Sequence, residues 1–260
     1  PRQTVVPNIC QDYTAVRNGA GSMSALLRKL GIFADLTSAE IALLDELTTA
    51  VRTTSAKRTI MAEGQRPQSL QLIVHGWAAR SKVLPSGARQ ITAFLIPGDF
   101  CDLHAKILGQ MDHSIVALTN CKVAWIQSDR LDEMTAQHTG LTRALWWGTL
   151  LDEAIARSWI VNIGGRDAYA RIANLLCEMH ARMTMVGLVE ADAMDFPITQ
   201  EELGDATDLT AVHINRTLQQ LRSDGLIELS ARRLKIKKYA ELAEAGGFDP
   251  RYLHLNRRIQ

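Results

Sequence analysis

The sequence predicts an α+β protein: an N-terminal antiparallel β-roll, a long central helix, and a C-terminal helix-turn-helix with a β-hairpin. Three observations support this prediction. Short apolar runs separated by glycines fill residues 58–127, an uninterrupted helical pattern follows over 131–163, and two capped helices joined by a tight turn come after Pro197. With 260 residues, of which 47% are hydrophobic, the chain is long enough to bury a sizeable core.

The composition excludes several classes of protein. No stretch approaches the ~18 consecutive apolar residues of a membrane helix, and residues 1–24, expected to form a loosely ordered tail, lack a signal-peptide core. These features favour a cytoplasmic protein. The net charge of +1 excludes a uniformly basic nucleic-acid binder. The cysteines are scattered, at Cys10, Cys101, Cys121 and Cys177, which predicts neither a disulfide framework nor a metal site.

The β-roll is expected after a short helical region. Residues 24–51 have helical spacing, with Thr37 or Ser38 as the N-cap before Glu40. Runs such as LQLIVH, ITAFLI and KVAWIQ then have the length of strands. Glycine supplies the positive φ that tight turns need, so its regular spacing indicates strands joined by turns. These turn glycines are Gly64, Gly76, Gly87 and Gly98.

The long helix is apolar on more than one side, so its side chains cannot all face one small roll. We therefore expect it to pair with a second copy of the chain across a two-fold axis, and the alternative is a helix buried inside one domain. The expected interface residues are Trp147, Leu151, Ile155 and Trp159. The pair Gly164-Gly165 is expected to interrupt the helix and to act as a hinge before the next one.

The C-terminal region has the signals of a helix-turn-helix. Thr199 and Glu202 form a capping box that starts a short helix, and Asp208 tolerates the left-handed conformation of a tight turn. Thr210 caps the second helix. In that helix, the apolar stripe at Ile214, Leu218 and Leu221 is expected to be buried. The outward or flanking positions are then Ala211, Val212, Asn215, Arg216 and Gln219.

Charge changes sign along this region. Residues 184–209 contain seven acids and no Lys or Arg, whereas residues 210–240 contain seven Lys or Arg and two acids. After Gly225, the runs LIEL and RLKIKK predict a hairpin that carries Arg232 and Arg233. Helix, turn, helix and basic hairpin describe a winged helix-turn-helix, whose second helix fits the major groove of DNA while the wing meets phosphate.

At this point the sequence resembles the Crp/Fnr regulators over residues 25–240. The resemblance rests on the order of LIVHG, IPGDF, a long helix and ITQEELGDATDLTAVHINRTLQQLRSDGLIEL. It implies a cyclic-nucleotide-binding-like roll, a dimerisation helix and a DNA-binding domain. The expected division is a tail at 1–24, a sensor roll at 25–130, a dimerisation helix and hinge at 131–165, a winged helix-turn-helix at 166–245 and an extension at 246–260.

The resemblance also implies which residues meet DNA. It places base contacts at Ala211, Val212 and Arg216, and phosphate contacts at Thr210 and His213. Arginine can donate two hydrogen bonds to guanine, whereas valine can only touch a thymine methyl group. Cyclic-AMP-responsive members resemble one another in having Arg then Glu where this chain has Ala211 and Val212, so a different base preference is expected. The remaining candidates are Thr199, Asn215, Arg232 and Arg233.

The sensor half departs from the relatives that bind cyclic nucleotides. Asp102 and Leu103 stand where those relatives have Gly-Glu, and His113 and Ser114 stand where they have Arg-Ser. Without the fixed cation and the ribose-binding carboxylate, cyclic AMP is not expected to bind. A lone Cys10 does not support an iron–sulfur cluster, and haem bound near His104 remains the alternative. We predict no cofactor and no metal, and leave the effector open.

The predicted function is that of a homodimeric regulator that binds a palindromic operator in double-stranded DNA, with RNA polymerase as a further partner. The chain has no GxSxG, P-loop or HExxH motif, so an enzyme is not expected. Two alternatives stay open. One is a sensor of haem or another small molecule in the same family, and the other is a ligand- or protein-interaction module that no longer reads DNA.

Overall fold

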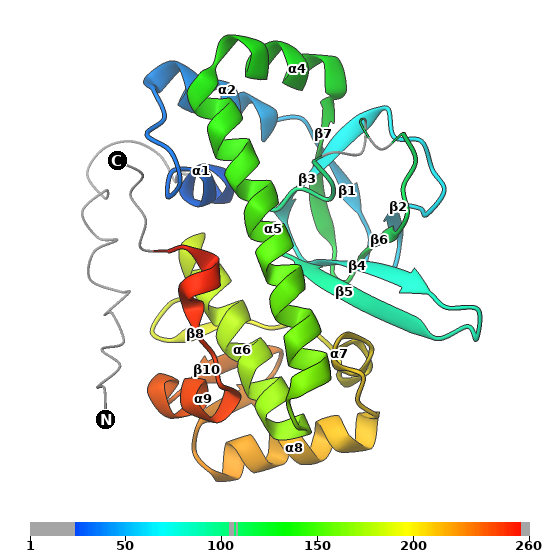
Figure 1. Cartoon of the computed structure of the whole chain (residues 1–260), viewed down its shortest axis with the longest axis vertical. Coiled ribbons are helices and arrows are strands. Elements are labelled where there is room, and N and C mark those ends of the chain that lie inside the picture. The colour runs from blue at the N-terminus through cyan, green and yellow to red at the C-terminus, as the bar shows by residue number, and fades with distance from the viewer. Residues whose placement is uncertain (1–23, 104–106, 108, 256–260) are drawn as a thin grey trace.

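The computed structural model describes residues 24–103, 107 and 109–255. The expected N-terminal tail up to residue 23 and His104 lie outside the described residues. The long helix α5 (Thr139–Gly165) runs the length of the molecule, with the β-roll beside its first half and the C-terminal domain beside its second half (Figure 1). This order of parts is the predicted one.

The roll consists of two antiparallel sheets. One has the order β1-β7-β3, and the other has the order β2-β6-β4-β5. All four predicted turn glycines have positive φ, between 82° and 91°, which confirms their role. The strands are β1 (Val51–Thr54), β2 (Thr59–Met61), β3 (Ser69–His75), β4 (Ala78–Val83), β5 (Arg89–Leu95), β6 (Ser114–Ala117) and β7 (Cys121–Gln127).

Helices α1 (Ala25–Leu30), α2 (Ser38–Leu47) and α4 (Ser128–Gln137) lie at the end of the roll where α5 begins (Figure 1). Thr37 is the N-cap of α2 and forms a capping box with Glu40, as the sequence predicted. The Glu40 carboxylate also accepts a hydrogen bond from the backbone N–H of Leu141, 3.0 Å away. It therefore anchors the first turn of α5 to α2.

The long helical region differs from the prediction at both ends. A break at His138, whose backbone is extended, divides it into α4 and α5. At the other end, the helix is interrupted one residue after the predicted pair. Gly164 and Gly165 are the last two helical residues of α5, and the chain leaves the helix at Arg166 before Asp167 caps α6 (Ala168–Met185). A hinge at the glycine pair stays a prediction.

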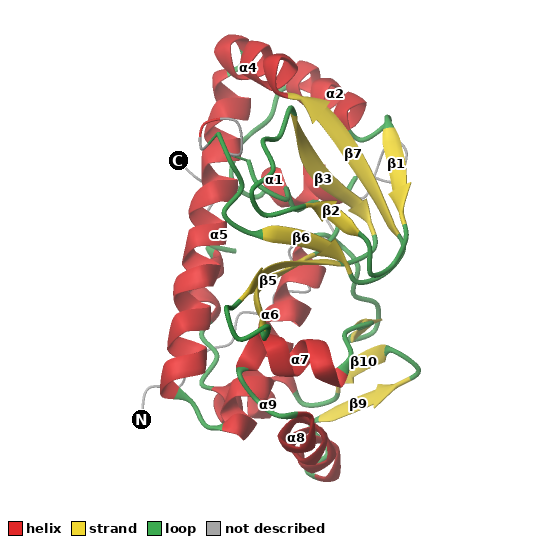
Figure 2. Cartoon of the chain, turned by 90° about the vertical axis from the view of Figure 1, so that its right-hand side faces the viewer, coloured by secondary structure: helices red, strands yellow, loops and turns green. Residues whose placement is uncertain are grey.

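The expected dimer contacts lie on the wrong face of α5. Leu151, Ile155 and Trp159 are buried within the chain, between the roll and α6, and Trp147 stacks on Phe33 with ring centroids 5.5 Å apart. Leu151, Ile155 and Trp159 are therefore not exposed for contact with a second copy, whereas Trp147 is half-buried. The opposite face carries the exposed apolar residues Trp146, Leu150, Ile160 and Val161, and no other element covers it in Figure 2.

The C-terminal domain combines the predicted motif with elements that the sequence did not predict. A three-stranded sheet of order β8-β10-β9 forms the wing. Strand β8 and the terminal helices α9 and η2 are additions to the prediction. The elements after α6 are β8 (Ala193–Asp195), α7 (Gln200–Thr207), α8 (Ala211–Ser223), β9 (Ile227–Ser230), β10 (Arg233–Ile236), α9 (Tyr239–Gly246) and η2 (Pro250–Leu253).

One apolar core joins the C-terminal domain to the roll. It contains residues of β4 and β5, the inward face of α5, α6 and the helix-turn-helix. Trp77 meets Phe196 edge to face, and Phe94 meets Trp159 in the same way, with centroids 6.1 and 5.6 Å apart. The chain segments assigned to separate domains therefore share side-chain packing. Among the described residues, no helix is long and apolar enough to cross a membrane.

Candidate nucleic-acid interface

The turn between α7 and α8 fixes the angle between the two helices. Thr199 caps α7, with its hydroxyl accepting from Glu202 N and the Glu202 carboxylate accepting from Thr199 N. Asp208 ends α7 in the left-handed conformation, with φ 54° and ψ 44°, and Thr210 caps α8. Each of these local predictions is confirmed.

Helix α6 supports this motif from behind. The Tyr169 hydroxyl donates to the Asp224 carboxylate at the end of α8, 2.6 Å away, and Arg171 donates to the Thr207 carbonyl at the end of α7. Burial and the bond to Asp224 raise the pKa of Tyr169 to about 12, so the hydroxyl keeps its proton at neutral pH. The ends of both helices are thus held by one rigid element.

Helix α8 buries one side and exposes the other. Ile214, Leu218 and Leu221 face the core, as predicted. Ala211, Val212, His213 and Arg216 are exposed, and Val212 keeps 76% of its surface open to solvent. Asn215 is half-buried, with its side-chain amide 3.5 Å from Gln200 of α7. In Figure 2, α8 lies at the end of the molecule, where no element covers its outer side.

Two candidates on this surface already have local partners, whereas Arg216 does not. Thr210 Oγ1 and His213 Nδ1 lie 3.2 Å apart. The Arg216 guanidinium has no hydrogen bond or ion pair with any residue in the described part of the chain. It is therefore free to donate two parallel hydrogen bonds, which is the geometry that guanine accepts in the major groove.

The wing presents basic residues beside α8. Ala231 and Arg232 form the turn between β9 and β10, and both have positive φ, at 48° and 60°. This turn type matches the twist of a tight hairpin but usually contains glycine or asparagine, so its non-glycine residues are strained. Arg232 is exposed at the tip. Arg233 is exposed too, and lies 3.9 Å from Asp195 across the sheet.

The expected effector residues are divided between a cavity and its surroundings. A cavity of about 360 Å³ lies between the roll and α5, and Asp102, Leu103 and His113 line it. Ser114 is outside the lining, because its hydroxyl accepts a hydrogen bond from Glu63 N at the roll surface. Three of the predicted residues therefore share one cavity and Ser114 does not, and an effector site there stays a prediction.

The polar lining of the cavity is mixed in charge. Four carboxylates, of Asp102, Asp112, Asp152 and Glu153, face two cations, Lys29 and Arg80. The Arg80 Nε and His113 Nε2 atoms are buried and have no hydrogen-bond partner among the described residues. Burial raises the pKa of Asp152, which lies 3.9 Å from Lys29 and 4.0 Å from Arg80. These two unpartnered atoms, Arg80 Nε and His113 Nε2, are thus available to a small ligand.

Two cysteines lie in the core of the roll. Cys101 and Cys121 are fully buried in the roll, and burial raises the pKa of both thiols, which disfavours the thiolate that binds metals. No group of three or more metal-ligating side chains occurs among residues 24–103, 107 and 109–255.

Comparison with known proteins matches each half of this arrangement. The model of the cyclic nucleotide-binding domain matches residues 51–138, and the model of the Crp-like helix-turn-helix domain matches residues 170–245. The chain belongs to the Crp/Fnr family. A Crp/Fnr regulator controls transcription by binding DNA through its helix-turn-helix, and this is the function of the chain.

Relatives within the family align over most of the chain. The transcriptional activator protein FnrL of Cereibacter sphaeroides is 26% identical over 227 residues, covering 86% of this chain and 90% of FnrL. The nitrogen fixation regulation protein FixK of Bradyrhizobium diazoefficiens is 26% identical, covering 82% and 88%. The structure of FixK2 from Bradyrhizobium japonicum has a TM-score of 0.68 and 25% identity, covering 75% of this chain and 96% of FixK2.

Proposed function

We propose that this Crp/Fnr regulator acts as a homodimer that reads a palindromic operator, with Arg216 as the main base-reading residue. The observation that carries this proposal is the unbound Arg216 guanidinium on the uncovered side of a capped α8. In a two-fold dimer, two such helices reach successive major grooves about 34 Å apart along one face of the duplex.

The outward face of α5 supplies a surface for the second copy. Trp146, Leu150, Ile160 and Val161 are all at least half exposed, which is unusual for large apolar side chains in a monomer. They recur along a helix of 27 residues, so two antiparallel or parallel copies can pair over several turns. The partner we propose for this face is therefore a second α5.

The test is a selection of bound sequences from a library of random duplexes, followed by affinity measurements on the selected operator. The full chain is expected to select a palindrome. Arg216→Ala should weaken binding by about 1–3 kcal/mol and relax the preference at one guanine in each half-site. Selection of no palindrome, or unchanged preference in Arg216→Ala, would contradict the proposal.

Arg222→Ala is the matched control, since Arg222 is an exposed arginine at the far end of the same helix. Losing a phosphate contact there would weaken binding equally on all sequences and leave base preference unchanged. A change of base preference in Arg222→Ala would show that the assignment of the reading face to the first two turns of α8 is wrong.

We also propose that the effector is a small polar molecule other than cyclic AMP. Carboxylates outnumber cations in the cavity wall, and the Lys29 ammonium already binds Asp99 at 2.7 Å. A cyclic phosphate would therefore meet repulsion without the charge-assisted bonds that it needs. Titration calorimetry should detect no cyclic AMP binding in the micromolar range, and binding in that range would contradict this proposal.

We propose RNA polymerase as the protein partner, because a regulator bound upstream of a promoter acts on it. We also propose that the protein works in the cytoplasm, where its DNA target would be. We propose no catalytic role, because no Ser or Cys nucleophile occurs among the described residues that line the cavity.

A further inference from the structure

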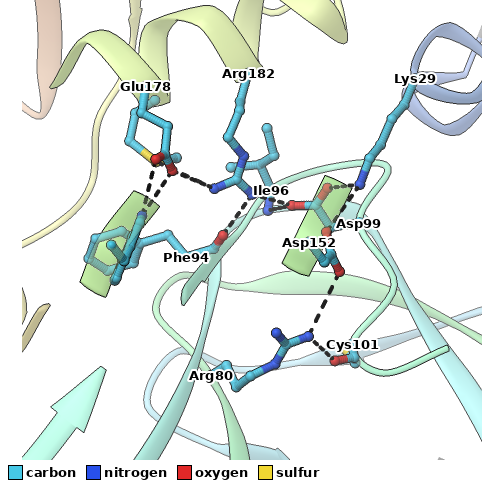
Figure 3. A network of polar contacts seen from close by, with 11 residues as sticks. Lys29, Arg80, Phe94, Ile96, Asp99, Cys101, Asp152, Glu178 and Arg182 are labelled. Atoms are coloured by element: carbon cyan, nitrogen blue, oxygen red, sulfur yellow. Dashed lines mark hydrogen bonds and ion pairs between the residues drawn. The ribbon is translucent and has the colours of Figure 1, made fainter. Parts of the chain in front are cut away.

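A buried chain of four alternating charges crosses the boundary between the roll and the DNA-binding domain (Figure 3). It consists of Lys29 on α1, Asp99 in the turn after β5, and Arg182 and Glu178 on α6; we call these four residues the ionic latch. Their side chains are between 1% and 7% exposed. Solvent therefore screens these contacts far less than surface ion pairs.

The Asp99 carboxylate binds residues on both sides of the boundary between the roll and the DNA-binding domain. One carboxylate oxygen accepts from Lys29 Nζ at 2.7 Å, and the other accepts from Arg182 Nη2 at 2.8 Å and from the Ile96 backbone N–H at 2.9 Å. Burial alone would raise the pKa of Asp99, but Lys29 and then Arg182 hold it below its usual range. The carboxylate is therefore charged and fully bonded at neutral pH.

Arg182 and Glu178 extend the latch into the rest of the molecule. Arg182 Nη2 also donates to the Phe94 carbonyl of β5, and its Nη1 lies 3.3 Å from Glu178. The Glu178 carboxylate accepts from Trp159 Nε1 of α5 at 3.0 Å and from the Tyr252 hydroxyl of η2 at 2.8 Å. The latch thus ties α6 to the roll, to α5 and to the C-terminal segment.

This arrangement specifies position more than it adds stability. Buried ion pairs lose much of their attraction to desolvation, and apolar residues of similar volume often stabilise a core as well. The Arg182 guanidinium, however, donates to two acceptors of the roll, Asp99 and the Phe94 carbonyl, and Glu178 on its own helix orients it, so these bonds favour one placement of α6. A second contact also holds the DNA-binding domain against the roll. Arg89 Nε and Gln90 Nε2 of β5 both donate hydrogen bonds to Asp205 of α7, each at 2.7 Å.

The docked placement leaves the reading face of α8 uncovered (Figure 2). Docking is therefore compatible with DNA binding and does not block it. For a dimer on a palindrome, holding each α8 in a fixed position relative to α5 raises the effective concentration of the second reading helix at its half-site. A loosely attached domain would have to be ordered on binding, at a cost in affinity.

We propose that the ionic latch sets the spacing of the two reading helices, so that Arg182 is a positioning residue for operator binding. This inference rests on the proposed dimeric function. It predicts that breaking the latch lowers affinity for the two-half-site operator while affinity for a single half-site is kept.

The first experiment measures domain placement without DNA. Nitroxide labels are attached at Ala42→Cys on α2 and Ser223→Cys on α8, both exposed positions, in a Cys10→Ser background. Labelled chains are diluted in unlabelled chains so that only distances within one chain are recorded by pulsed electron resonance. The unmodified latch should give one narrow distance distribution, and the Asp99→Asn/Arg182→Met double variant, which removes one charge of each sign, should give a broad one.

Arg182→Lys is the second variant, in case the double variant does not fold. Lysine keeps the charge but cannot bridge Asp99, Glu178 and Phe94 together, so the distribution should again broaden. Arg130→Met is the matched control, because Arg130 is an exposed arginine of α4 that pairs with Glu46 and Glu133. It should leave the distribution narrow. The proposal is overturned if a latch variant folds and still gives a distance distribution as narrow as that of the unmodified chain.

The second experiment uses the selected operator and a duplex with one half-site destroyed. Latch variants should bind the two-half-site duplex at least about tenfold more weakly, with less than about twofold change on the single half-site. Equal losses on both duplexes would mean a purely structural role and overturn the proposal. If the chain selects no operator at all, the proposed function is wrong. The distance measurement would still show whether the ionic latch fixes the position of α8 relative to the roll.

Discussion

The two faces of α5 have similar residues but opposite surroundings. Ile155 on the inward face is 4% exposed, whereas Ile160 on the outward face is 71% exposed. Tryptophan shows the same contrast, since Trp159 is buried against Phe94 and Trp146 is 67% exposed. The inward face therefore belongs to the fold of one chain. The outward face remains available for a second chain.

This contrast shows that one helix serves two interfaces of different kinds. The inward face buries apolar surface permanently, so its side chains contribute to the unfolding free energy of each chain. The outward face gains from burial only when two chains meet, so its contribution depends on protein concentration. Substitutions on the two faces are thus expected to change different measured quantities.

The largest expected effect comes from truncating the inward face. Ile155→Ala should lower the free energy of unfolding by about 2–5 kcal/mol, because it removes a buried side chain and leaves a cavity. The matched substitution Ile160→Ala should change it by less than about 0.5 kcal/mol. Urea unfolding at a concentration where the chain is monomeric measures both values. Similar losses for the two variants would remove the distinction between the faces.

A charge on the outward face should break the pairing of chains. Ile160→Glu would place two carboxylates near the two-fold axis and raise the dissociation constant of the dimer by about thirtyfold, or ~2 kcal/mol. Sedimentation equilibrium measures this constant. Ile41→Glu, at a partly exposed position on α2, is the control and should leave association unchanged. If Ile160→Glu also leaves it unchanged, the second copy uses another surface.

The smallest expected effect concerns the anchor at the start of α5 and depends on pH. The Thr37 backbone N–H, which hydrogen-bonds to the Glu40 carboxylate, is the main group that holds the pKa of Glu40 below its usual value of 4.5. Its charge therefore stabilises the folded chain above that value, and the stabilisation is lost as the pH falls through the lower, folded-state pKa. Glu40→Gln should cost about 1 kcal/mol at pH 7.

Urea unfolding of both chains at pH 7 and near pH 3 tests this linkage. The difference in unfolding free energy between the original chain and Glu40→Gln should shrink toward zero at the lower pH. If the difference in unfolding free energy is the same at both pH values, the charge of Glu40 is not what stabilises the folded chain at this contact.

The helix-turn-helix could be predicted residue by residue because its signals are local. Thr199, Asp208 and Thr210 each act on backbone groups within a few residues, so sequence spacing specifies their geometry. The turn glycines of the roll are predictable for the same reason. For the predicted DNA-contacting residues of α8, the structure shows that most of the side chains are exposed. Their contacts with DNA stay a prediction.

The faces of α5 and the ionic latch could not be predicted in this way. A helix that is apolar on more than one side does not reveal which side meets its own roll, and so the expected interface at Leu151, Ile155 and Trp159 was wrong. The latch joins residues far apart in the chain, with a sequence separation of 70 from Lys29 to Asp99 and of 83 from Asp99 to Arg182. No local pattern marks such a contact.

The shared core described above limits how this protein can be recombined. Phe196 of the DNA-binding domain packs on Trp77 of the roll, and Trp159 of α5 packs on Phe94. A chimaera that joined residues after Asp167 to the sensor of another regulator would leave Phe196 without Trp77 unless the recipient offered the same shape, whereas Phe94 and Trp159 would be replaced together. Sensor and reader of this protein have therefore to be exchanged, or evolved, as a matched pair.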